Sequence, residues 1–133
     1  MTSQNAALLQ QMMADYAAGK LGAMYAVINH DAVFVESPEL PFGGEYIGAK
    51  GFQRLMENML SQYEMYATDG EVWDAGERVI LKVNAHFTSK KTGAKGSTAV
   101  AEIYRFANGK ITGADVFYHA PGDIAKLHDV PAS

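Results

Sequence analysis

The sequence predicts a single α+β domain in which helices come first along the chain and an antiparallel sheet follows. Two patterns carry this prediction. Up to about residue 63, apolar residues recur three and four positions apart, whereas beyond it short turns separate runs rich in β-branched and aromatic residues. Helices followed by a strand meander are typical of α+β domains. The 133 residues fit one domain with its own core.

The first helix is expected to follow Thr2 or Ser3, either of which can cap it, and to end at Gly19. Its apolar residues form one face because they lie three or four positions apart. They are Leu8, Leu9, Met12, Met13 and Tyr16. The same spacing predicts a shorter helix over residues 21–28.

One short strand and a long loop are expected next. Residues 33–36 have strand composition, whereas residues 37–48 contain Pro38, Pro41 and three glycines, which is typical of a crossover loop. Apolar spacing then predicts a third amphipathic helix over residues 52–63.

Four strands are expected in the second half of the chain, over residues 66–73, 78–89, 97–106 and 111–119. The turns between them are short, and short turns join antiparallel neighbours. A last helical turn is expected around Pro121, Ile124 and Leu127, and we expect residues 128–133 to fray. The domain prediction therefore covers residues 1–133 as one unit.

Composition excludes several kinds of chemistry. The chain has no cysteine, which removes disulfides, thiolate nucleophiles and cysteine-ligated metals. Its 11 Lys and Arg against 15 Asp and Glu give a net charge of -4 without the basic face that nucleic acids require. No apolar stretch approaches the roughly 20 residues of a membrane span, and no leader pattern is present. We expect a soluble cytoplasmic protein without nucleic-acid or membrane partners.

No group of residues in the sequence has the spacing of a known cofactor-binding or metal-binding motif. The glycines of residues 43–48 match neither a dinucleotide fingerprint nor a phosphate loop, and Ser37 lacks the context of a hydrolase nucleophile. The histidines are never three or four positions apart, so a metal site has little support. They are His30, His86, His119 and His128. We expect no cofactor and no metal.

Two segments carry a family resemblance: GGEYIGAKGF at residues 43–52 and YRFANGKI at residues 104–111. Together with the element order, they resemble the SnoaL-like branch of the nuclear transport factor two and ketosteroid isomerase superfamily. The resemblance covers nearly the whole chain. It implies a cone, in which a curved antiparallel sheet wraps around the N-terminal helices and leaves an open-ended pocket, and it implies a homodimer.

The resemblance also allows a residue-by-residue comparison with ketosteroid isomerases. Met12 falls near their oxyanion-binding tyrosine, Ser37 at the position of their catalytic base, and Glu102 at the position of their protonated aspartate. A serine hydroxyl is too weakly basic to remove an α-proton. His119 stands where SnoaL-like members often carry an aspartate. Steroid isomerisation by that mechanism is therefore not expected.

Glu102 is the first candidate for catalysis. It shares a strand face with Val100, Tyr104 and Phe106. If that face looks into the cone, burial among aromatic residues raises the pKa of its carboxyl toward neutrality. The alternative is a solvated outer face, where Glu102 pairs with Lys82.

His86 is the second candidate. A hairpin centred near Thr92 places His86 opposite Thr98 and Lys82 opposite Glu102, so that Asn84 and His86 share the face of Glu102. That face forms either a polar pocket wall or an outer surface. A shift of one residue in the register reverses the arrangement.

Further ligand contacts are expected from Tyr16, Trp73, Tyr104 and Tyr118, which combine an apolar body with a polar tip, and from Ser37 and Asn84. Core packing is the alternative role for the aromatic residues. Methionines at helical spacing fill the core or line an adaptable pocket.

These observations predict that the protein binds a small, apolar or oxygenated metabolite. They also predict cofactor-free acid/base catalysis of the isomerase, cyclase, dehydratase or hydrolase type, with Glu102 moving the proton and His86 as its partner. The alternative is a ligand-binding or dimeric interaction protein without turnover.

Overall fold

The computed structural model describes residues 3–130. The helical elements are α1 (Gln4–Ala17), α2 (Leu21–Ala26), α3 (Gly48–Gln62), α4 (Pro121–Ala125) and the 3-10 turn η1 (Lys126–His128). The strands are β1 (Ile28–Glu36), β2 (Gly44–Ile47), β3 (Tyr63–Asp74), β4 (Arg78–Ser89), β5 (Lys95–Ala107) and β6 (Lys110–Tyr118). The predicted α+β class is confirmed. No helix within residues 3–130 is both long and apolar enough to cross a membrane.

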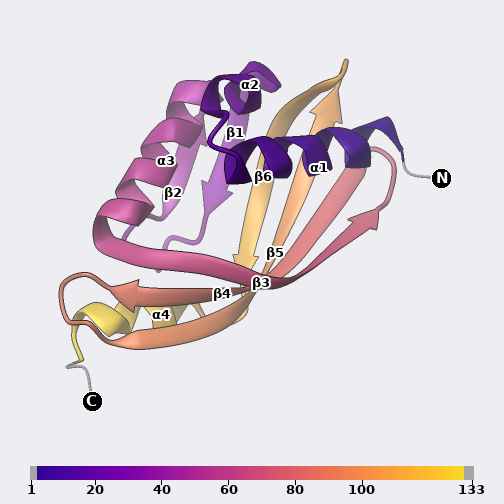
Figure 1. Cartoon of the computed structure of the whole chain (residues 1–133). Helices are drawn as coiled ribbons and strands as arrows, with labels where there is room; N and C mark the ends of the chain where they lie inside the picture. Colours follow the sequence, from indigo (N-terminus) through magenta and orange to yellow (C-terminus); the bar gives the residue numbers. More distant parts are fainter. Residues whose placement is uncertain (1–2, 131–133) are drawn as a thin grey trace.

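The strands form one curved sheet in the order β2-β1-β6-β5-β4-β3. From β3 to β6 the sheet is the predicted antiparallel meander, but β1 runs parallel to β6. Figure 1 shows α1 and α3 on one side of this sheet. That side is the inner face, and the opposite side is called the outer face below. The arrangement is the predicted cone around the N-terminal helices.

Residues 44–47 correct the prediction of an unbroken loop over residues 37–48. They form β2, which pairs with β1 at the edge of the sheet. Both prolines of the segment lie before residue 42, so the backbone N–H groups of β2 remain free to pair. The loop itself is anchored in the core by Leu40 and Phe42, which are 5% and 0% exposed.

The first and third helices begin at residues suited to helix starts. Ser3 caps α1 as predicted, because its side chain accepts a hydrogen bond from the backbone N–H of Ala6. Helix α3 begins four residues earlier than expected, at Gly48, whose φ of 71° favours glycine. A Cβ there would lie 2.7 Å from the carbonyl oxygen of His30, so only glycine fits against β1.

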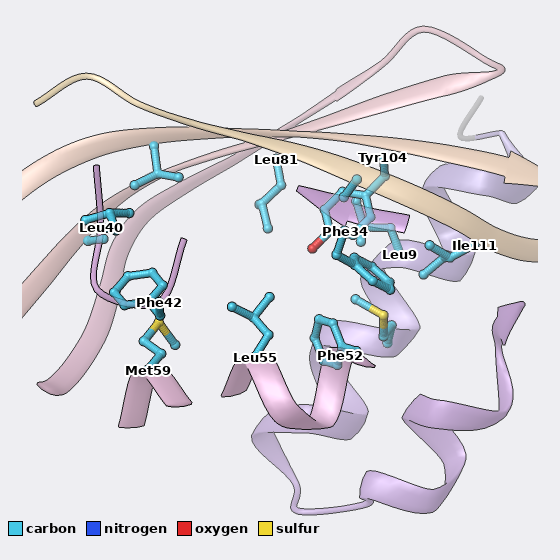
Figure 2. Packing of buried hydrophobic residues seen from close by; sticks show 14 of the residues in the cluster. Leu9, Phe34, Leu40, Phe42, Phe52, Leu55, Met59, Leu81, Tyr104 and Ile111 are labelled. Atoms are coloured by element: carbon cyan, nitrogen blue, oxygen red, sulfur yellow. The ribbon is translucent and has the colours of Figure 1, made fainter. Parts of the chain in front are cut away.

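The core lies between the helices and the inner face of the sheet. In Figure 2, Phe52 and Leu55 of α3 rise toward Phe34 and Leu81 of the sheet. A second aromatic cluster forms where Phe42 packs against Tyr63 and Phe87, with ring centroids 5.9 and 6.2 Å away.

The C-terminal segment packs against Tyr63 of this cluster, and the helical turn predicted around Ile124 is confirmed. The Tyr63 hydroxyl donates to the carbonyl oxygen of Ile124 at 3.0 Å. The His128 ring stacks on Tyr63, and its Nδ1 lies 2.6 Å from Ser89 Oγ. Residues 131–133 of the predicted frayed tail lie outside the described residues.

Candidate functional site

A cavity of about 290 Å³ lies between α1, α2, α3 and the inner face of the sheet. This volume is close to the lower limit of small-molecule sites, roughly 300 Å³. Most of the lining is apolar, and six of the seven methionines contribute to it: Met12, Met13, Met24, Met56, Met59 and Met65. Because methionine side chains are flexible, this lining can adapt its shape to a ligand.

The polar groups of the cavity are two carboxyls and three phenols. They belong to Tyr16, Glu36, Glu102, Tyr104 and Tyr118. The prediction that Tyr16, Glu102, Tyr104 and Tyr118 share one site agrees with this lining. Among the described residues, no lysine, arginine or histidine lines the cavity.

The register of β4 and β5 places Glu102 inside. Glu102 pairs with Leu81, and His86 pairs with Ser97. The predicted pairs, Glu102 with Lys82 and His86 with Thr98, are therefore wrong by one residue. The five-residue connection between the strands, with Gly93 at a φ of 78°, shifts the register by this amount. Such a slip exchanges the two faces of a strand.

His86 is consequently on the outer face, away from Glu102, and the predicted catalytic partnership is not supported. Its Nδ1 lies 2.7 Å from Ser97 Oγ, and its Nε2 lies 2.8 Å from Thr68 Oγ1. Its ring stacks on Tyr66 with centroids 4.6 Å apart. Every polar atom of the imidazole is thus engaged in holding neighbouring strands together.

Three other predicted ligand contacts also lie outside the cavity. Asn84 is on the outer face, where its amide donates to Asp69 Oδ2 at 2.9 Å. Trp73 is 50% exposed and shares that face, because it pairs with Ile80. Ser37 is the first residue of the loop after β1, which ends at Glu36. Ser37 does not line the cavity.

Glu36, which the sequence analysis did not select, takes the place expected for Ser37. It is 5% exposed and lines the cavity. The Tyr118 hydroxyl donates to its Oε1 over 3.4 Å, while its Oε2 has no hydrogen-bond partner. A sequence signal existed, because Glu36 lies two residues after Phe34 on the predicted strand and therefore shares its buried face.

Glu36 is the harder of the two carboxyls to ionise. Burial raises the pKa of Glu36 to about 8, the negative charge of Glu102 adds to the rise, and the Tyr118 hydrogen bond opposes it. Below about pH 8 the Glu36 carboxyl therefore holds its proton. With that proton, Oε2 can act as a hydrogen-bond donor into the cavity.

Glu102 has a closer hydrogen-bond donor than Glu36. Burial raises the pKa of its carboxyl, but the Tyr104 hydroxyl donates to Oε1 at 2.8 Å and opposes the rise. This bond is shorter than the one that Glu36 receives. Because two coupled carboxyls in one cavity disfavour double ionisation, the charge of Glu102 favours retention of the proton on Glu36.

The mouth of the cavity lies between the end of α1 and the middle of β3. Tyr16, which is 43% exposed, and Ala67, which is also exposed, both line the cavity. His119 is exposed and does not line the cavity.

Metal binding has no support in the described part of the chain, because no three His, Asp or Glu residues there form a cluster that could hold an ion.

A sequence model of the SnoaL-like domain matches residues 9–114, a span that includes both carboxyls of the cavity. The chain belongs to the SnoaL-like family. No curated protein matches the sequence.

Solved structures confirm that this SnoaL-like chain has the nuclear transport factor two-like fold. An NTF2-like protein from Burkholderia thailandensis is 21% identical with a TM-score of 0.85, covering 98% of this chain and 100% of its own. A Xanthomonas campestris protein named a polyketide cyclase is 22% identical with a TM-score of 0.75, covering 93% and 96%.

A third structure, from Catenulispora acidiphila, has a ketosteroid isomerase-like fold and was solved in complex with trimethylamine. It is 14% identical with a TM-score of 0.72, and the match covers 93% of each chain. At these identities the likeness shows the fold alone, because one fold supports many activities.

Proposed function

We propose that this protein is a cofactor-free acid/base enzyme that acts on a small, largely apolar carbonyl compound held in the cavity. One observation carries the proposal: Glu36 and Glu102 line the same, otherwise apolar cavity, and Glu36 Oε2 has no partner within the protein. A pair of carboxyls whose environments differ can divide the acid and base roles between them.

In this proposal Glu102 is the base and Glu36 is the hydrogen-bond donor. The Glu102 carboxylate takes a proton from the carbon beside the substrate carbonyl, while protonated Glu36 donates to the carbonyl oxygen and stabilises the enolate. Return of the same proton from Glu102 to another carbon completes an isomerisation. Attack of the enolate carbon on a second carbonyl would instead give a cyclisation, with the proton passing to the new alkoxide.

Tyr104 serves as a positioning residue. Its hydroxyl is committed to Glu102 Oε1, and burial followed by the charge of Glu102 raises the pKa of Tyr104 well above its usual range. Tyr104 therefore stays protonated and leaves the second oxygen of Glu102 to face the substrate. The names of structural neighbours, among them polyketide cyclases, are compatible with chemistry of this kind.

The test follows deuterium exchange at the α-carbon of cyclohexanone in D2O at neutral pD by NMR, because every enolising reaction begins with that step. We expect the protein to accelerate exchange and Glu102→Gln to reduce the acceleration about 100-fold. Glu64→Gln is the matched control, because Glu64 is exposed on β3 and does not line the cavity. Exchange no faster than in buffer would favour the non-catalytic ligand-binding alternative.

We also propose a homodimer formed through the outer face. Trp73 and Phe117 are 50% and 57% exposed there, and Trp73, Ile80 and Ile103 form one row across three strands. A twofold axis would bring this apolar row against its own copy. Sedimentation equilibrium should give twice the chain mass, reduced to one chain by Phe117→Lys. A single-chain mass at the highest concentration would contradict the dimer.

A further inference from the structure

The charge of the cavity distinguishes among ligand classes. All five polar residues that line it are acids, and none of the described basic residues is among them. When one of the two carboxyls, Glu36 or Glu102, is ionised, the cavity carries a negative charge. The protein supplies no countercharge inside the cavity, and low-polarity surroundings screen that charge poorly.

We propose that the cavity selects its ligands by charge, binding small apolar amines as monocations and rejecting carboxylates and phosphates. This inference rests on the carboxyl pair of the proposed function and adds the ligand charge that the same site favours. When one carboxyl is ionised, a protonated amine makes the occupied cavity neutral, a neutral ligand leaves one negative charge, and a carboxylate adds a second.

The hydrogen-bond inventory of the cavity supports the same class. Glu36 Oε2 is buried and without a partner, so it can accept the N–H of an ammonium group once Glu36 is ionised. The remaining groups of the amine would meet apolar side chains. Rings from Phe34, Phe52 and Phe87 also line the cavity, and aromatic faces attract cations.

The test uses three ligands that share a cyclohexyl ring and a head group of three heavy atoms: N,N-dimethylcyclohexylamine, cyclohexyl methyl ketone and cyclohexanecarboxylate. Binding at pH 7 is followed through the 13C-methyl signals of the methionines, six of which line the cavity. This readout needs no turnover. We expect the amine to bind at least tenfold more tightly than the ketone, and the acid to cause no shift at the same concentration.

Two further experiments test whether the carboxyl pair causes the preference for the amine over the ketone. The double variant Glu36→Gln with Glu102→Gln should bring the affinities for amine and ketone within about twofold, whereas Glu64→Gln should keep the preference. In the unmodified protein, a pH low enough to protonate both carboxyls should remove the preference as well. That experiment holds even if the double variant fails to fold.

Equal binding of amine and ketone at pH 7, binding of the acid as tight as that of the amine, or an amine preference that survives loss of both ionisable carboxyls would each overturn the inference. None of these results would affect the proposed catalysis. Conversely, tight amine binding without cyclohexanone exchange would remove the catalytic proposal and leave charge selection in place.

Discussion

Polar side chains on the two faces of the sheet differ in their hydrogen bonding. On the outer face, His86 has a hydrogen-bond partner at each ring nitrogen, and Asn84 donates to Asp69. On the inner face, Glu36 keeps an oxygen without a partner although its side chain is only 5% exposed. Satisfied polar groups tie strands together, whereas an unsatisfied buried group is free to act on a ligand. The chemistry of this protein should therefore be confined to the inner face.

The pKa shifts of acids on the two faces also have opposite signs. Burial raises the pKa of Glu36, whereas hydrogen bonds from Asn84 and Thr68 lower the pKa of Asp69 on the outer face. A raised carboxyl pKa means that the folded state binds the proton more tightly than the unfolded state does. Glu36 thus stabilises the fold at low pH, and that contribution is lost as the pH rises toward about 8.

The largest expected effect is on stability. From pH 4.5 to 8, ionisation of Glu36 should cost about 4 kcal/mol of unfolding free energy, since one pKa unit corresponds to about 1.4 kcal/mol and the group is half-titrated at each end of this range. Urea denaturation across this range should show the decline, and Glu36→Gln should largely remove it. Wild type and Glu36→Gln losing stability in parallel would show that Glu36 is not the group responsible.

An intermediate effect is expected from Tyr104→Phe, which removes the hydrogen bond to Glu102 Oε1. Without this donor the carboxylate is less stable, so the pKa of Glu102 should rise. Cyclohexanone exchange at neutral pH should fall about tenfold, and its pH profile should move upward. A lower rate with an unmoved profile would mean that Tyr104 does not act through Glu102.

The smallest effect is expected on the outer face. His86→Ala removes two hydrogen bonds between partly exposed groups and should lower the unfolding free energy by about 1 kcal/mol. Exchange of cyclohexanone and binding of the amine should stay within twofold of wild type. A large loss of either property, with the fold intact by circular dichroism, would place His86 in the functional site after all.

The fold was predictable because its signals are local. Helical spacing located α1, and short turns separated β3, β4, β5 and β6, although the boundaries moved by a few residues. The strand β2 was missed because glycines and prolines dominate its surroundings. Its pairing with β1 depends on a tertiary contact that no local pattern contains.

The site was only partly predictable. Glu102 and Tyr104 share a strand face by simple alternation, and both line the cavity. The assignments of His86 and Asn84 failed because they depended on the register across a five-residue connection, where one residue decides the face. The same alternation places Glu36 on the buried face of Phe34, two residues away. The comparison with ketosteroid isomerases selected its neighbour Ser37 instead.

The carboxyl pair can be tested most directly by 13C NMR titration of the glutamate side chains, assigned with Glu36→Gln and Glu102→Gln. We expect Glu36 to titrate near pH 8 in the wild-type protein and its pKa to fall when Glu102→Gln removes the neighbouring charge. Titration of both Glu36 and Glu102 at the ordinary value of about 4.3, without mutual influence, would contradict a coupled, buried carboxyl pair.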